Sequence, residues 1–341
     1  MISVIKSLKY TLLSCMILGT AVSRAQDIHF SQFSVPSSFL NPALTGDFHG
    51  DWRAGLIHRD QWRSIAQPYV SSLAFFDRQF YLYSQQINAG IILIRDQSGL
   101  ASLTNNKVYL NLSYHVKSGR STIMLGLQPG LVIKSFNPSK LTFPSQWDQS
   151  VGYFNGELDN MENGYGNRSI YYFDLGAGMN WAMDLPGFRP SVGFAFFHLN
   201  QANESFNGAS SKLVMRQVIH ANARIAVRGK HYLFPELSMN TMNRANSFIG
   251  GLTFGKRYGA SSQVSELFCG ISARTGFERN ADAAIPMIGM KIGHWRTALS
   301  YDINISNLSQ ATQNRGAAEI SIVYTALSTI PKHSAIPCER F

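Results

Sequence analysis

Residues 108–116 alternate apolar and polar side chains without a break, and this alternation constrains the fold more than any other feature of the chain. One parity is apolar and comprises Val108, Leu110, Leu112, Tyr114 and Val116. The other parity comprises Tyr109, Asn111, Ser113 and His115. Successive side chains of a strand point to opposite faces, so the pattern predicts a strand between apolar and polar surroundings.

The first 25 residues have the parts of an export signal. Lys6 and Lys9 give a positive start, residues 10–22 are mostly apolar, and Ser23-Arg24-Ala25 is a small-residue cleavage site. We expect cleavage after Ala25, because the apolar run is too short to be a spanning helix. A lipidated Cys15 is the less favoured alternative, because too few apolar residues separate it from Lys9.

Composition alone does not distinguish a soluble β-protein from a membrane barrel. Mean hydropathy is −0.07, but half of each strand of an outer-membrane barrel is polar. No segment after the signal reaches about 18 uncharged apolar residues, which argues against a helical membrane protein. The formal charge of +10 is dispersed rather than clustered, which argues against nucleic-acid binding.

Strand-like segments recur between Arg53 and Thr325, and about fourteen of them have the length of tilted membrane strands. Short and long connections alternate between them, except around residues 256–266, and residues 137–169 form the longest. This pattern predicts an all-β, antiparallel, up-and-down transmembrane barrel in the outer membrane, with both termini in the periplasm. Its expected parts are a periplasmic N-terminal segment at 26–50 that enters or caps the barrel mouth, the barrel at 51–326, and a periplasmic tail at 327–341.

Polar residues in the strands are expected to line the lumen. A charge on the lipid face costs about 2–4 kcal/mol at mid-bilayer, so Arg224, Asp302 and Glu319 should point inward, with His220 beside them. Aromatic residues near strand ends suit the two interfacial girdles. They are Trp62, Phe80, Tyr81, Trp181, Tyr232 and Trp295.

The sequence contains no arrangement typical of a catalyst or a cofactor site. There is no GxSxG, HExxH or paired-histidine spacing, so we expect no enzyme activity, cofactor or metal. Residues 155–163 form an acidic loop that lacks regular calcium-loop spacing, so a solvated loop is favoured. Cys269 and Cys338 are compatible with a disulfide or with two free thiols.

Several short motifs resemble, in the same order, those of the PorP/SprF family of outer-membrane proteins linked to type IX secretion and gliding in Bacteroidota. The matching stretches are 26–33, Asn41-Pro42-Ala43 with Gly46, 58–62, 141–143 with 147–148, 197–201, 203–206, 300–302 and 338–341. The chain departs from the family pattern at Ile28, His58, Asp60 and Glu339.

The resemblance implies a non-enzymatic barrel that assists export or surface attachment of a large adhesin-like protein and contacts peptidoglycan-associated machinery in the periplasm. The motif positions are then candidate partner-binding residues: Asp27, His29, Phe30, Gln32, Asn41, Pro42, Arg59, Gln61, Trp62, Cys338, Arg340 and Phe341. A channel for a small solute or lipid-like molecule, lined by the four lumen residues, is the alternative. A soluble periplasmic β-sandwich binder is the third hypothesis.

Overall fold

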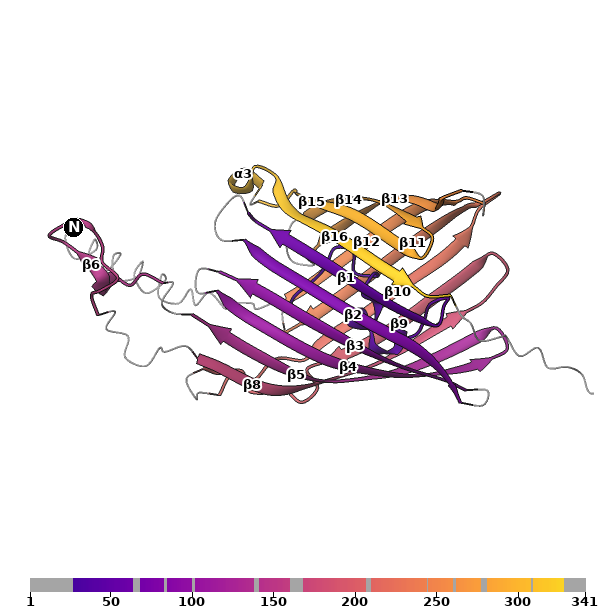
Figure 1. Ribbon diagram of the computed structural model, residues 1–341, viewed down its shortest axis with the longest axis horizontal. Helices are drawn as coiled ribbons and strands as arrows, with labels where there is room; N and C mark the ends of the chain where they lie inside the picture. Colours follow the sequence, from indigo (N-terminus) through magenta and orange to yellow (C-terminus); the bar gives the residue numbers. More distant parts are fainter. Residues whose placement is uncertain are drawn as a thin grey trace, which may run out of the picture.

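The chain forms a closed antiparallel β-barrel (Figure 1). The computed structural model describes residues 27–63, 68–82, 85–99, 102–137, 141–159, 168–206, 210–243, 245–259, 262–276, 281–307 and 309–327. Within these ranges the barrel strands are β1 (Trp52–Gln61), β2 (Tyr69–Leu82), β3 (Gln85–Ser98), β4 (Leu103–Ser118), β5 (Ser121–Phe136), β8 (Arg168–Met183), β9 (Phe188–Phe197), β10 (Arg216–Ala226), β11 (His231–Met242), β12 (Ala245–Arg257), β13 (Val264–Thr275), β14 (Ala281–Ile292), β15 (Trp295–Asn304) and β16 (Arg315–Thr325).

Each strand pairs with its neighbours in sequence, and β1 pairs with β16 to close the barrel. The closing seam brings residues together that are far apart in the chain, such as Arg59 opposite Glu319. The predicted fourteen-stranded up-and-down barrel is therefore confirmed, and closure leaves no unpaired sheet edge. Helices are short throughout the described residues, and none has the length and apolar character needed to cross a membrane.

The two ends of the barrel differ in their connections. At one end, here the short-turn end, the strands are joined by residues 83–84, 119–120, 184–187, 227–230, 258–263 and 293–294. At the other, the long-loop end, the connections include 137–167, 198–215 and 305–314, although only two residues separate β11 from β12 there. The 137–167 connection holds η3 (Pro144–Gln146) and a small hairpin of β6 (Trp147–Asp148) and β7 (Tyr153–Phe154), with β6 drawn at the far left of Figure 1. The short helix α3 (Ser309–Thr312) lies in the 305–314 connection, at the upper edge of the barrel in the same view.

The alternation at 108–116 has the predicted orientation. Leu110 is 48% exposed on the outer face of β4, whereas its neighbour Asn111 is fully buried inside the barrel. Asp302, Glu319 and His220 also point inward and are at most 2% exposed. Arg224 shares the inward parity of His220 on β10 but is exposed to solvent. The outer face is thus apolar and the inner face polar.

The girdle prediction is wrong for Tyr232. Phe80, Trp181 and Trp295 are exposed on the barrel surface near strand ends, as expected for a girdle. Tyr232, however, is 7% exposed and points inward, where its hydroxyl donates a 2.7 Å hydrogen bond to Glu266. Its parity on β11 places it across from Gly255 of β12, where the missing side chain leaves room for the ring.

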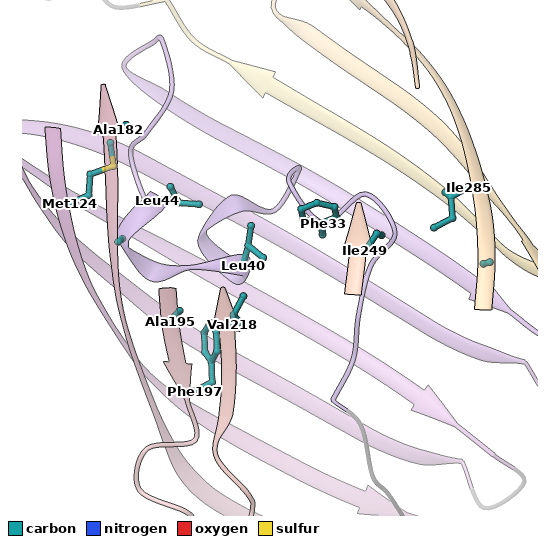
Figure 2. Packing of buried hydrophobic residues seen from close by; sticks show 12 residues of the cluster. Phe33, Leu40, Leu44, Met124, Ala182, Ala195, Phe197, Val218, Ile249 and Ile285 are labelled. Carbon is teal, nitrogen blue, oxygen red and sulfur yellow. The ribbon is translucent and has the colours of Figure 1, made fainter. Parts of the chain in front are cut away.

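Residues 27–51, here the inner segment, run through the barrel interior from the long-loop half to the short-turn end (Figure 1). This is the stretch expected to enter or cap a mouth. It contains α2 (Ser37–Leu40) and η1 (Pro42–Leu44). Phe33, Leu40 and Leu44 pack against the barrel wall at residues such as Met124 and Val218 (Figure 2). Phe30 and Phe39 join a second apolar cluster with Ile57, Leu73 and Ile92.

We expect Leu110→Arg to destabilise the barrel in lipid by about 2–4 kcal/mol, because the new charge faces the middle of the bilayer. Val116→Arg, on the same face but near the end of β4, should cost only about 0–1 kcal/mol. Reversible unfolding from phospholipid vesicles would measure both variants. Equal costs at the two positions would contradict this placement of β4.

Candidate functional site: the anchors of the inner segment

Two buried carboxylates of the barrel wall hold the start of the inner segment. Glu319 of β16 accepts hydrogen bonds from the backbone N–H groups of Ser31 (2.6 Å) and Gln32 (2.9 Å). Asp302 of β15 accepts a bond from the Ser31 hydroxyl at 2.7 Å. Both carboxylates are almost fully buried, so these contacts replace the water that each would otherwise bind.

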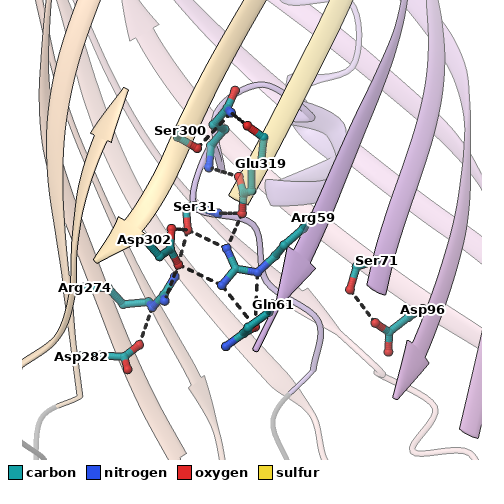
Figure 3. A network of polar contacts seen from close by, with 11 residues as sticks. Ser31, Arg59, Gln61, Ser71, Asp96, Arg274, Asp282, Ser300, Asp302 and Glu319 are labelled. Carbon is teal, nitrogen blue, oxygen red and sulfur yellow. Dashed lines mark hydrogen bonds and ion pairs between the residues drawn. The ribbon is translucent and has the colours of Figure 1, made fainter. Parts of the chain in front are cut away.

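Two buried guanidinium groups complete this cluster (Figure 3). Arg59 of β1 pairs with Glu319 and lies 2.9 Å from Asp302. Arg274 of β13 lies 2.7 Å from Asp302 and 2.6 Å from Asp282. Two cations therefore face three carboxylates, and charge-assisted bonds of this kind are stronger than neutral ones.

The hydroxyl of Ser31 is fully used at the centre of the cluster. It donates to Asp302 and accepts from Arg59 at 2.8 Å and from Arg274 at 3.0 Å. A hydroxyl has one donor and two acceptor sites, so no further bond is possible there. Gln32 adds bonds to Ser300 and Ser321 on the same wall. We call Ser31, Arg59, Arg274, Asp302 and Glu319 the upper anchor.

Asp27 is held in a second charged group near the long-loop end. Its carboxylate lies 2.7 Å from Lys107 and within 3.5 Å of Arg216 and His198. Burial opposes its ionisation, but Lys107 and Arg216 hold the pKa of Asp27 well below its usual range. Burial likewise lowers the pKa of His198, but the carboxylates of Asp174 and Asp27 outweigh burial and raise it.

The Asn41-Pro42-Ala43 motif packs against the barrel wall where two glycines leave room for it. A Cβ on Gly126 of β5 would collide with the Pro42–Ala43 backbone, and one on Gly178 of β8 would collide with Asn41. Asn41 caps η1 by accepting from the Ala43 N–H, and its amide donates to the carbonyls of Met179 and Phe194. The amide nitrogen also lies 3.0 Å from His220 Nε2.

A third contact fixes the segment near the short-turn end. Asp77 of β2 accepts from the Gly46 N–H at 2.9 Å and is paired with Arg53. Gln79 donates to the carbonyls of Gly46 and Phe48. Gly46 has φ +77°, a left-handed conformation that suits glycine, and any side chain there would meet Asn88.

The structure brings most of the predicted site residues into one internal system. Phe30, Gln32, Asn41, Pro42 and Arg59 are buried inside the barrel, as is the ring nitrogen Nε2 of His29, and Asp27 is nearly so. They contact the chain's own wall residues. Gln61 accepts from Arg59, whereas Trp62 lies beyond β1 and stacks edge-on with Tyr69. Residues 1–26, 160–167 and 328–341, with the export signal, the end of the acidic loop from residue 160 on, Cys338, Arg340 and Phe341, lie outside the described part of the chain.

Sequence reasoning missed the residues that receive the inner segment. Arg274, Asp77, Gly126 and Gly178 lie on strands whose pairing with residues 27–51 cannot be read from local pattern. Arg274 could have been found, because a charged residue within a strand should face the lumen rather than lipid, as was argued for Arg224. In the described ranges no group of histidine, cysteine and acidic side chains is arranged to hold a metal.

Fold and site together define a barrel of the outer-membrane type that carries its own internal segment. A family model described as "Type IX secretion system membrane protein PorP/SprF" matches residues 22–324, and the chain belongs to this family. No curated protein matches the sequence significantly.

Solved structures share the architecture at low sequence identity. The chain resembles a deletion mutant of the TodX monoaromatic hydrocarbon channel with a TM-score of 0.50 at 10% identity, covering 85% of this chain and 93% of that one. The Ralstonia pickettii toluene transporter TbuX gives a TM-score of 0.49 at 10% identity, covering 86% and 94%. At this identity the likeness to the TodX mutant shows the barrel fold alone.

We expect Arg59→Met to release the start of the inner segment, because it leaves Glu319 without its buried cation and Asp302 with only one. Breaking a buried pair from one side costs about 3–5 kcal/mol. Faster amide hydrogen exchange at residues 28–34, with slow exchange retained in the strands, would show the release. Arg63→Met is the matched control, because Arg63 is 81% exposed in its pair with Asp60 and contributes at most about 1 kcal/mol. Unchanged exchange in Arg59→Met would refute the anchor.

The Asp27 contact should weaken as pH rises. A raised pKa for His198 means that its contribution is complete below about pH 6.5 and is lost as pH rises through the folded-state pKa. The lowered pKa of Asp27 places its own contribution above about pH 3.9, and this is lost only on acidification. Hydrogen exchange at residues 27–30, corrected for intrinsic rates, should therefore accelerate as the pH rises above about 6.5. His198→Gln should abolish that dependence, whereas His58→Gln, half-buried beside Ser72, should keep it.

Proposed function

We propose that the protein is a non-enzymatic outer-membrane barrel of the type IX secretion and gliding system that assists export or surface attachment of a large adhesin-like protein. The match of residues 22–324 to the PorP/SprF family carries this proposal. The apolar outer face and polar inner face suit a barrel in lipid. An export signal at residues 1–25, cleaved after Ala25, would deliver the chain to the outer membrane.

In this proposal the short-turn end faces the periplasm and the long-loop end faces outward, as is usual for outer-membrane barrels. The tail at 327–341, with Cys338, Arg340 and Phe341, would then meet a peptidoglycan-associated component of the machinery. The motif residues Asp27, His29, Phe30, Gln32, Asn41, Pro42, Arg59 and Gln61 act indirectly, by holding the inner segment in place, while Trp62 lies beside the long-loop end.

The hairpin of the 137–167 connection offers a surface for the secreted protein. Trp147, Tyr153 and Phe154 are about half exposed, and the Trp147 and Phe154 rings pack edge-on at 5.0 Å. Exposed aromatic clusters of this kind mark protein-binding sites, because rings bury much area at small entropic cost. Figure 1 shows β6 well away from the barrel wall, where a large partner has access.

A channel for a small solute or lipid-like molecule is the second candidate. One observation favours it: the inner segment is held by hydrogen bonds and ion pairs, so its removal leaves a lumen lined by Arg59, His220, Asp302 and Glu319. A channel predicts planar-bilayer conductance that is absent in the intact protein and present when residues 27–46 are deleted. Conductance absent from both forms would exclude it.

Replacing Trp147 and Tyr153 together with serine should reduce surface display of the secreted client while the barrel remains folded. The hairpin loses its exposed aromatic contact area but no strand of the barrel changes. Protease accessibility of the client on intact cells measures display, and heat-modifiable gel mobility reports the barrel. Val192→Ser, an equally exposed apolar position on the outer face of β9, is the control. Normal display in a strain that lacks the whole gene would refute the proposed function.

A further inference from the structure

A group of cationic side chains lies inside the barrel toward the short-turn end. It comprises Arg224 of β10, Arg257 of β12, Lys291 of β14 and Arg296 of β15. Glu266 of β13 lies among them. It is 2.6 Å from Arg296 and 3.9 Å from Arg257, and it is paired in register with Lys291. Four cations therefore surround a single carboxylate, and we call these five residues the mouth cluster.

Parity places these cations in the lumen rather than against lipid. Arg224 shares the face of buried His220, while Ile219 on the other face of β10 is 54% exposed. Arg296 likewise shares the face of Asp302, and Lys291 that of buried Ile285. The cations therefore do not meet the headgroups of the surrounding bilayer.

The mouth cluster is held in place by aromatic rings. Arg296 stacks over Phe268 at 3.9 Å, and Arg257 lies over Tyr232 at 5.4 Å. Tyr232 in turn donates to Glu266. Two of the cations are thus positioned before any ligand arrives, which lowers the entropic cost of binding.

Positive charge in this cluster is not balanced within the described part of the chain. Arg224 has no carboxylate within salt-bridge distance there, although it feels the charges of Arg257, Arg296 and Glu266. The next carboxylate, Glu236, lies deeper, beside Ser34 of the inner segment. On the neighbouring strand β9, Arg189 stands opposite Arg224 in register and is already paired with Asp47 and Asp184. In the upper anchor, by contrast, the two arginines are balanced by Asp302 and Glu319, and Asp282 adds a third carboxylate beside Arg274.

The positive field extends to the end of the inner segment. Burial, and then the charges of Arg224 and Arg189, lower the pKa of His49. Arg224 and Arg257 are themselves exposed, at 54% for Arg257, and are accessible to a group that enters from the short-turn end.

We propose that the mouth cluster binds the carboxylates of an acidic peptide segment of a protein partner at the short-turn end. Arginine forks bind carboxylates with two parallel hydrogen bonds, and Glu266 already shows a carboxylate in contact with Arg296. The inference deepens the proposed function, because it assigns the chemistry by which the barrel meets a periplasmic component. Charge steering into a low-dielectric lumen also speeds such an encounter.

Calorimetry with the full-length protein in a neutral detergent tests this proposal. The probe is hexaglutamate with blocked ends, and hexaglutamine is the uncharged comparison. We expect hexaglutamate alone to bind, with an affinity that falls as salt rises. Arg224→Glu combined with Arg257→Glu should weaken binding at least about tenfold, because each reversal removes an attraction and adds a repulsion. The single variant Arg224→Gln, which removes no ion pair, should weaken it in the same direction.

Arg315→Glu is the matched control, because Arg315 is an exposed arginine at the long-loop end of β16. It should change the affinity by less than about twofold. Equal binding of the two peptides, no loss in the double variant, or an equal loss in Arg315→Glu would overturn the proposal. Binding of phosphatidylglycerol vesicles instead, lost in the double variant, would assign the cluster to lipid and also overturn it. These measurements use purified protein, so a failure of this proposal is distinguishable from a failure of the proposed function, which is tested by display of the client on cells.

Discussion

The structure depends on one constraint: a polar group that the alternating strands turn inward and that the fold buries is costly unless it finds a partner. Glu319 and Asp302 show how the chain meets it. Their carboxylates accept hydrogen bonds from Ser31 and Gln32 and pair with two arginines. The inner segment thus replaces water at the wall carboxylates, and the wall in turn holds the segment in place. Neither part is satisfied alone, because an unpaired buried carboxylate is costly.

The same constraint divides the interior into two regions of different character. In the upper anchor and at Asn41, the side chains are buried and their hydrogen bonds are made within the chain. In the mouth cluster, cations exceed carboxylates and Arg257 remains half exposed. The first region makes its contacts within the chain, and so it serves stability. The second retains binding capacity, and so it is where chemistry with another molecule is expected.

Much of the fold was predictable, because a two-residue period acts locally and leaves its mark in the sequence. It correctly placed Leu110 outside and Asp302 and Glu319 inside, and it predicted β5 with the bounds that the structure shows. The girdle rule fails for Tyr232, because it uses only nearness to a strand end, whereas Tyr232 shares the inward parity of Glu236 and Ser238 on β11. The anchors were beyond such reasoning. Ser31 and Glu319 are 288 residues apart, and glycines such as Gly126 and Gly178 give no signal of what they receive.

The upper anchor also bridges the place where the cylinder is joined. Arg59 belongs to the first barrel strand and Glu319 to the last, and Ser31 binds both from within. These two strands are synthesised at opposite ends of the chain, and their ladder forms only when the barrel closes. The inner segment thus links β1 and β16 from inside the barrel. Sideways parting of β1 from β16 would break the contacts of Ser31 as well as the ladder, so the inner segment reinforces the join between the first and the last strand.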